Sequence, residues 1–204
     1  MSNMRVEASK LHRLFYPQVP LVLAAKFRDR VSAMPVVSYA SVSDSPPLIA
    51  VACAPKTFTY RLCSRAHVFS LSLLDSSKVK QMESLVKVRG GDVEDKLLEV
   101  GLQYSAGKAV DVPVIADAVA SIECSVDTKR KTGDHALLIG RVEACDAIED
   151  FSDFWGYRSY RPILYTGWRG RMTVFASAIG AEPAEGRYRS HLMKQTSPRT
   201  SNHR

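Results

Sequence analysis

The stretch from Ala33 to Thr59 limits the possible folds more than any other part of the 204-residue chain. Within it, Val36 to Ser43 alternates apolar and hydroxyl side chains, which is typical of a strand with one polar face. Asp44-Ser45-Pro46-Pro47 ends that strand with turn-forming residues, and Leu48 to Ala54 resumes as an apolar strand. The sequence therefore predicts two strands that meet at a rigid corner and carry small hydroxyl side chains.

A polar turn follows the second of these strands. Lys56, Thr57 and Thr59 supply one cation and two hydroxyl groups beside a helix predicted over Phe58 to Arg65. Since the first N–H groups of a helix lack intrahelical acceptors, this turn is suited to a phosphate. The alternatives are that Lys56 is an ordinary surface lysine and Thr59 a helix cap. The sequence has no Gly-rich phosphate loop of the Rossmann or P-loop type.

Several short segments form a pattern that is more specific than any one of them. They are Ser38 to Pro47, Lys56 to Thr59, Phe69 to Leu74, Asp95-Lys96-Leu97, Ala120 to Cys124, and Gly133-Asp134-His135 followed by Ile139 to Val142. In order and spacing they resemble the motifs S-F-T-S-V-S-x-x-P-P, a basic Thr-containing phosphate turn, F-V-V-N-V-L, D-K-F, L-E-C and G-D-H-x-x-x-x-G-x-V of the flavin reductase-like family. The resemblance runs from Arg13 to Gly167, and Ser72 replaces the Asn of the third motif.

The resemblance implies a fold that is mainly β with short helices, an FMN-binding split β-barrel of the Greek-key type. It also implies non-covalent FMN, NADH or NADPH as the hydride donor, and a homodimer. The cofactor-binding residues that it implies are Ser38, Tyr39, Ala40, Ser41, Val42, Ser43, Lys56, Thr57, Thr59, Ser72 and Lys96. Composition alone would make the three serines of the first motif solvent-facing strand residues. A strand edge with small side chains would, however, let backbone groups approach an isoalloxazine ring closely.

His135 is the candidate catalytic residue. A single histidine is more often structural, but the preceding Gly133-Asp134 and the family resemblance favour a position beside the flavin or nicotinamide. There it would orient the hydride donor or supply a proton. No nucleophile or metal is required. The four cysteines show no C-x-x-C spacing, so we expect reduced, mostly buried thiols rather than a zinc or dithiol site.

The remaining patterns predict the order of the elements. Strands are expected over Leu21 to Phe27, Val31 to Ser38, His67 to Leu74, Val112 to Ile115, Ala118 to Val126, His135 to Ala147, Pro162 to Trp168 and Met172 to Ala176, the last two completing the barrel. Helices are expected after the cap Asp75-Ser76-Ser77 and over Val93 to Val100. Thr128 to Asp134 is expected to be an exposed turn, and Gly140 to allow a bend or a close approach. We divide the chain into a loosely held segment (1–12), one split-barrel domain (13–181) and a basic, flexible tail (182–204).

Composition and charge restrict the function further. The apolar runs are too short to cross a bilayer and no signal peptide is visible, so we expect a cytoplasmic protein. The net charge of +7 is compatible with nucleic-acid binding, but the sequence contains no RNP or helix-turn-helix signature. A basic surface that attracts anionic cofactors explains the charge equally well. The aromatic loop from Phe151 to Tyr160 is expected to be covered by a second subunit or to form a lid.

These features predict an FMN-binding, NAD(P)H-dependent flavin reductase. Reduced flavin would pass to a partner monooxygenase or stay bound and pass electrons to another acceptor. A flavoredoxin-like electron carrier or a ferric reductase is the related alternative. The alternative from a different class is a basic β-barrel that binds nucleic acid without catalysis. The sequence does not decide between NADH and NADPH or between FMN and FAD.

Overall fold

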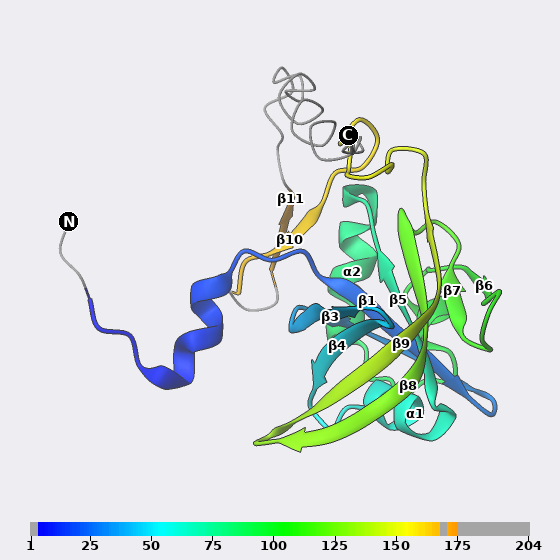
Figure 1. Cartoon of the computed structure of the whole chain (residues 1–204), viewed down its shortest axis with the longest axis horizontal. Coiled ribbons are helices and arrows are strands. Elements are labelled where there is room, and N and C mark those ends of the chain that lie inside the picture. The colour runs from blue at the N-terminus through cyan, green and yellow to red at the C-terminus, as the bar shows by residue number, and fades with distance from the viewer. Residues whose placement is uncertain (1–3, 168–170, 175–204) are drawn as a thin grey trace, which may run out of the picture.

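The computed structural model describes residues 4–167 and 171–174, and most of its strands belong to one antiparallel sheet (Figure 1). The seven strands of this sheet are β1 (Leu21–Phe27), β2 (Arg30–Val36), β3 (Tyr39–Asp44), β4 (Pro47–Cys53), β5 (Val68–Leu73), β8 (Ala120–Thr132) and β9 (His135–Ala147). Their order in the sheet is β2-β1-β5-β8-β9-β4-β3. This confirms the prediction of a mainly β protein.

The sheet closes on itself because its two outermost strands are neighbours in the chain. β2 and β3 lie at opposite ends of the strand order, yet only Val37 and Ser38 separate them in sequence. The backbone N–H of Ala52 on β4 donates to the carbonyl of Ser38 at 2.8 Å, which holds this link against the far end of the sheet. The result is a barrel, as predicted. The expected continuous strand from Val36 to Ser43 is wrong, since the chain leaves the ladder at this crossing.

The barrel interior is filled by alternate residues of the central strands. Leu23, Phe69, Leu71, Val51 and Leu138 are fully buried in one cluster. Gly140 on β9 makes room for this packing, because a Cβ there would collide with the ring of Phe69. The close approach expected at this glycine is therefore confirmed.

A second apolar cluster lies on the outer face of β1 and β2. There Val22 and Ala24 pack with residues of α2 (Val79–Lys87) and α3 (Lys96–Glu99), among them Leu85 and Leu97. β1 is thus buried on both faces, which explains why its sequence is a continuous apolar run. α1 (Phe58–Ala66) contributes Leu62 and Cys63 to the interior cluster and closes one end of the barrel.

Three predicted elements differ from the structure. The helix expected over Val93 to Val100 is shorter, because Asp95 caps α3 by accepting from the N–H of Leu98. The turn expected over Thr128 to Asp134 is only two residues long, since β8 continues to Thr132 and pairs there with His135. β10 (Ile163–Tyr165) and β11 (Met172–Val174) form a separate two-stranded sheet and do not complete the barrel.

Shorter elements complete the described part of the chain. They are the 3-10 helices η1 (Ala8–Phe15) and η2 (Ser76–Lys78) and a small sheet of β6 (Tyr104–Ala106) and β7 (Pro113–Ile115). η1 falls mostly within the N-terminal segment expected to be loosely held, buries none of its residues and projects from the barrel (Figure 1). None of the helices in residues 4–167 and 171–174 is long and apolar enough to cross a membrane. The predicted tail lies outside the described residues.

Candidate functional site

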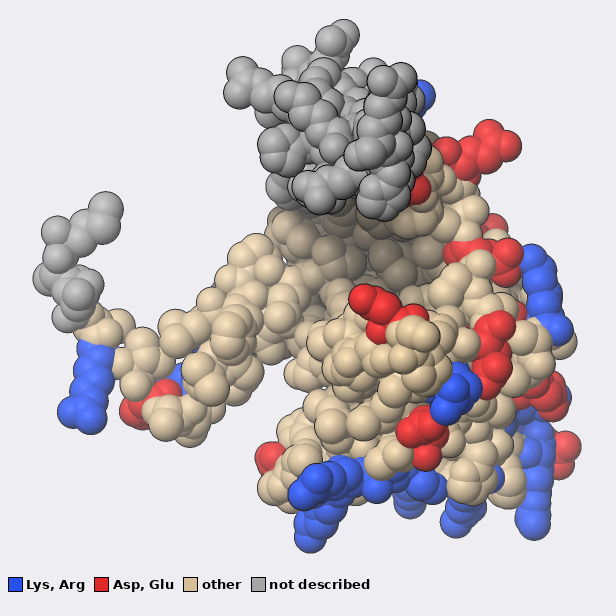
Figure 2. Space-filling view, viewed as in Figure 1, with Lys and Arg blue, Asp and Glu red and all other residues tan. Residues whose placement is uncertain are grey.

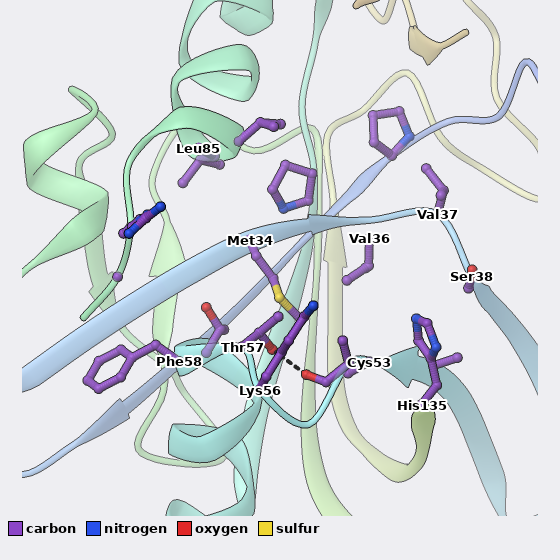
Figure 3. A pocket seen from close by; sticks show the side chains of 18 of the residues that line it. Met34, Val36, Val37, Ser38, Cys53, Lys56, Thr57, Phe58, Leu85 and His135 are labelled. Carbon is purple, nitrogen blue, oxygen red and sulfur yellow. Dashed lines mark hydrogen bonds between the residues drawn. The ribbon is translucent and has the colours of Figure 1, made fainter. Parts of the chain in front are cut away.

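A cavity of about 1360 Å³ opens where the β2–β3 link, the end of β4 and the start of α1 meet (Figure 3). The end of α2, the following loop 88–92, Lys96 of α3 and the tip of the β8–β9 hairpin also line it, together with residues of η1, Tyr16, and Tyr165 and Met172 of the β10–β11 sheet. Met34, Val36 and Leu85 give it apolar surface. Ligand pockets commonly have volumes of about 300–1,000 Å³, so this cavity has room for more than one ligand group.

The N-terminus of α1 forms a polar end of the cavity. Thr57 is the N-cap residue, but its hydroxyl donates to the carbonyl of Ala54 at 2.8 Å and does not cap the helix. The N–H groups of Phe58, Thr59 and Tyr60 therefore have no acceptor within the described part of the chain. Lys56 is exposed on the same turn, and its side chain rises toward Met34 in Figure 3. This end of the cavity is built to receive an anion.

Lys96 adds a buried cation to that end. Its residue is only 4% exposed, and burial lowers the pKa of its ammonium group to about 8. The preceding residue, Asp95, forms a parallel β-bridge with Val31 of β2. Ser32, the next residue of β2, has its hydroxyl oxygen 2.9 Å from the hydroxyl oxygen of Thr59 on α1. No residue in ranges 4–167 and 171–174 accepts a hydrogen bond from the Lys96 amine. Its Nζ atom is not one of the fully buried polar atoms, and Lys96 lines the cavity, so the amine can meet an anionic ligand there.

The loop 88–92 is held over this end by Arg30 of β2. One guanidinium nitrogen of Arg30 donates to the carbonyls of Gly90, Gly91 and Val93 at 3.2, 3.0 and 2.7 Å. A Cβ at Gly90 would collide with the Ser32 hydroxyl, so only glycine lets the loop approach so closely. Sequence reasoning missed these residues. The Gly90-Gly91 pair indicates a tight loop, but the sequence does not indicate that this loop binds Arg30.

The tip of the β8–β9 hairpin forms a further polar wall of the cavity, next to the end of β4, because Ala136 pairs with Cys53. The Nδ1 atom of His135 lies 2.8 Å from a carboxylate oxygen of Asp134. Because a carboxylate only accepts, Nδ1 carries the proton and Nε2 is left to act toward the cavity. The pKa of Asp134 is lowered, chiefly by His135 and more weakly by Lys56, so the two predicted residues lie near one another.

The structure brings only some of the predicted site residues together. The cavity is lined by Ser38, Lys56, Thr57, Thr59, Lys96 and His135. Thr59 is buried and its hydroxyl is engaged by Ser32, so its backbone N–H rather than its side chain is free for a ligand. The cavity lining does not include Tyr39, Ala40, Ser41, Val42, Ser43 or Ser72.

The residues outside the cavity lie on β3 and β5, and the buried hydroxyl of Ser72 has no hydrogen-bond partner among the described residues. Tyr39 donates its hydroxyl hydrogen bond to the carbonyl of Val19 at 2.8 Å, and Ala40, Ser41 and Val42 are exposed on the sheet edge formed by β3. Ser72 is fully buried on β5. Since Phe69 and Leu71 point into the barrel, strand alternation directs Ser72 to the opposite face, away from the cavity.

The cysteines fit the predicted structural role. Cys53, Cys63 and Cys124 are buried, and Cys145 is exposed. Burial raises the pKa of Cys53, which lines the cavity, to about 12, so its thiol is protonated at neutral pH. The described residues contain no His, Cys, Asp and Glu cluster that could hold a metal ion.

Comparison with known proteins agrees with this geometry. The model of the flavin reductase like domain matches residues 12–167, which is most of the chain. The chain belongs to the flavin reductase-like family. This confirms the resemblance found in its motifs, and the split-barrel fold is the one shared by its structural neighbours.

Relatives and solved structures support the same assignment. An uncharacterized protein of Aeropyrum pernix is 34% identical over 80% of this chain, which spans 62% of that protein's length. An NADH-dependent flavin reductase of Pseudomonas fluorescens is 30% identical over 67% of this chain and 75% of its own length. The crystal structure of an FMN-binding protein from Thermus thermophilus superposes with a TM-score of 0.72 at 28% identity, covering 85% of this chain and 96% of that one.

Proposed function

We propose that this protein binds FMN and reduces it with NADH or NADPH. The observation that carries the proposal is that one cavity is lined by Lys96, by the free N–H groups at the start of α1, and by His135 at the hairpin tip. Lys96 and these N–H groups suit the phosphate of a flavin nucleotide. The apolar walls of the cavity suit a flat ring system.

The phosphate contacts are assigned to the α1 end. The N–H groups of Phe58 and Thr59, the Thr57 hydroxyl, and the amines of Lys56 and Lys96 would together hold a phosphate dianion. A dianion would also restore the full positive charge of Lys96, because a nearby opposite charge favours the protonated amine. The same residues would exclude a ligand without an anionic group from that end.

His135 is assigned to the wall where hydride transfer takes place. Bound FMN supplies the N5 atom that accepts a hydride from C4 of the nicotinamide. His135, oriented by Asp134, would position the nicotinamide or hold a proton at Nε2. The cavity volume leaves room for a nicotinamide beside the flavin.

A homodimer is part of the proposal. Phe154 and Tyr157 are 58% and 50% exposed in the loop 151–160, and Val42 on the edge strand β3 is 51% exposed. Three hydrogen bonds from the N–H groups of Arg158, Ser159 and Tyr160 to Asp150 hold the loop in shape without a partner. A rigid loop with exposed rings is a surface that a second subunit would cover. A sedimentation experiment that shows only monomer at micromolar concentration would contradict the homodimer.

The resemblance to the flavin reductase-like family implies a partner monooxygenase as the acceptor of reduced flavin. We assign the same destination to the reduced flavin of this protein. Retention of the flavin for transfer to another electron acceptor is the alternative, and a filtration assay after anaerobic reduction separates the two. Reduced flavin in the filtrate supports release, whereas reduced flavin retained with the protein supports the carrier role.

The decisive experiment is a titration of the flavin-free protein with FMN and riboflavin, followed by anaerobic mixing with NADH or NADPH. We expect FMN to bind more tightly than riboflavin and its visible absorption to bleach on addition of the nucleotide. Protein that binds no flavin but binds oligonucleotides in a strongly salt-dependent way would contradict the proposal and support a nucleic-acid-binding barrel.

A further inference from the structure

Arg30 contacts both the loop 88–92 and the first residue of α1. It begins β2, and one of its guanidinium nitrogens donates to three carbonyls between positions 90 and 93. Its guanidinium carbon also lies 4.8 Å from the centroid of the Phe58 ring. Phe58 is the first residue of α1, and its N–H is one of the donors without an acceptor in the described part of the chain. One side chain thus joins the sheet, the loop and the anion-binding end of α1.

Arg30 supplies the long-range hydrogen bonds of the loop. Among residues 4–167 and 171–174, the other hydrogen bonds of the loop are local. Val88 donates to the carbonyl of Ser84 on α2 at 2.9 Å, and Asp92 donates to the carbonyl of Arg89 at 3.1 Å. The position of the loop relative to β2 and α1 therefore depends on Arg30.

The loop also packs tightly against β2 and α1. A Cβ at Gly90 would collide with the hydroxyl of Ser32 and lie 3.3 Å from the Phe58 ring. The Ser32 hydroxyl in turn lies 2.9 Å from that of Thr59 on α1. The loop therefore fits in place only while position 90 has no side chain and Arg30 binds its carbonyls.

The loop forms part of the cavity wall and carries a cation. Arg89 and Asp92 line the cavity together with the two glycines between them. Arg89 is exposed, and its guanidinium group has no hydrogen-bond or ion-pair partner among the described residues. A loosened loop would displace this wall and its charge, as well as the support of the Phe58 ring at the start of α1. Binding groups are effective when the surrounding residues hold them in place before the ligand arrives.

We propose that Arg30 is a positioning residue for the flavin phosphate. This inference rests on the proposed function, because it takes the α1 end as the phosphate site. Arg30 is not part of the cavity lining, so it would act through the loop 88–92 and Phe58 and not by touching the phosphate. A planar guanidinium group can lie on the ring with its face and donate to carbonyls with its edge. Its contribution should therefore appear in the affinity for FMN and not in the affinity for a flavin without phosphate.

Two variants displace the loop in different ways. Arg30→Gln removes the guanidinium group, and with it the hydrogen bonds to the loop and one positive charge. Gly90→Ala keeps every charge but places a methyl group against the Ser32 hydroxyl, so the loop has to shift. In a Ser32→Ala background the colliding oxygen is absent. Gly90→Ala should therefore cost less FMN affinity in that background than in the unmodified protein.

Arg65→Gln is the matched control for the loss of charge. Figure 2 shows Lys and Arg side chains gathered along the lower side of the molecule, where Figure 1 places α1. Any charge lost there weakens the general attraction for an anion. Arg65 belongs to α1, is exposed and lies outside the cavity lining. This control measures the effect of charge without a change in the loop.

Dissociation constants for FMN and riboflavin are measured for every variant, and melting temperatures verify folding. We expect Arg30→Gln and Gly90→Ala each to lose about tenfold in FMN affinity, while riboflavin affinity changes by less than about twofold. Arg65→Gln should lose less than about twofold for FMN. A purely structural role of Arg30 would lower the melting temperature without changing the ratio of FMN affinity to riboflavin affinity.

Three results would each overturn the inference: equal losses for the two flavins, a loss no larger than that of Arg65→Gln, or a loss confined to Arg30→Gln. If Arg30→Gln does not fold, Gly90→Ala and its Ser32→Ala background decide the question. The proposed function fails separately, if the unmodified protein binds FMN no more tightly than riboflavin.

Discussion

Two regions of the cavity differ in how their polar groups are supported. At the α1 end, Lys96 is buried without a partner and the helix N–H groups are free, so the protein carries unpaired polar groups. At the hairpin tip, His135 is half-buried and already hydrogen-bonded to the exposed Asp134. The polar groups at the start of α1 therefore lack protein partners among the described residues, whereas His135 already has one in Asp134.

This difference predicts that one region controls the affinity for the flavin nucleotide and the other the rate of flavin reduction. Groups that lack partners in the empty protein gain most from an anionic ligand, so the α1 end should control how tightly the flavin nucleotide binds. A solvent-accessible histidine with a fixed tautomer gains little from binding but can position a reactant or move a proton. Substitutions in the two regions should therefore change different measured quantities.

The largest effect is expected at the hairpin tip. His135→Ala should slow flavin reduction by NAD(P)H by about tenfold to a thousandfold, because a positioning or proton-holding group is lost. FMN affinity and melting temperature should stay nearly constant. Anaerobic stopped-flow bleaching of bound flavin isolates this step from later electron transfer.

Asp134→Ala is the matched control for His135. It leaves the imidazole in place but removes the acceptor that fixes its tautomer, so a smaller decrease is expected. Unchanged bleaching in His135→Ala would mean that the histidine is structural. Loss of FMN affinity in the same variant would show that the two regions are not separable.

The next effect concerns Lys96. Lys96→Met should weaken FMN binding by about tenfold to a hundredfold, since a charge-assisted contact with phosphate disappears. Riboflavin, which lacks the phosphate, should bind the variant and the unmodified protein equally well. Equal losses for FMN and riboflavin would place Lys96 at the ring and contradict its assignment to the phosphate.

The same substitution should stabilise the empty protein. The lowered pKa of Lys96 means that its protonated form is disfavoured by burial, and one pKa unit corresponds to about 1.4 kcal/mol. Lys96→Met should raise the free energy of unfolding without ligand by roughly 1 to 3 kcal/mol at pH 7. Denaturant unfolding of the flavin-free proteins measures this, and a destabilised variant would mean that Lys96 has a structural partner.

Local sequence patterns predicted most of the strands, the family resemblance predicted the barrel, and six of the predicted site residues line the cavity. The apolar run of β1, the turn at Lys56 and Thr57, and the His135 motif each lie within a few consecutive residues, so their structural meaning is local. The exposed helix N-terminus also followed from local rules, although Thr57 directs its hydroxyl to Ala54 and leaves more N–H groups free than a normal cap.

The missed part of the site depends on pairing between distant residues. Arg30 and loop 88–92 are about sixty positions apart, and nothing near Arg30 in the sequence indicates that one of its guanidinium nitrogens binds carbonyls of that loop. Ser72 was taken from a motif match, but the face it occupies follows from the packing of Phe69 and Leu71 in the barrel. The contrast between Lys96 and Lys56 likewise follows only from three-dimensional burial.

FMN binding should also depend on pH. Lys96 must be protonated to bind phosphate, and its pKa in the empty protein is about 8. FMN affinity should be steady near pH 7 and fall about fivefold to tenfold between pH 7.5 and 9 as the amine loses its proton. Riboflavin affinity should not follow this curve, and in Lys96→Met the decrease should disappear. A decrease that persists in the variant would assign the titration to another group.

The same pKa predicts an opposite trend for stability. Because the pKa of Lys96 is lowered in the folded state, the unfolded chain binds more protons between pH 8 and the ordinary lysine value near 10.5. This group therefore makes the flavin-free protein more stable as pH rises through that window. The difference in unfolding free energy between the unmodified protein and Lys96→Met should shrink over the same range.

The smallest effect is expected for Lys56→Ala. Lys56 lies on the same turn as the free N–H groups, but it is exposed, so water and salt screen its attraction for a phosphate. FMN affinity should fall only about twofold to fivefold, and the loss should shrink further at high ionic strength. Lys80→Ala, at an exposed position of α2, is the control for a change in overall charge. The loss caused by Lys96→Met should persist at high salt, because a buried pair is screened much less. If Lys56→Ala proved as costly and as insensitive to salt as Lys96→Met, the bound phosphate would lie out on the turn, and the buried amine would need another ligand.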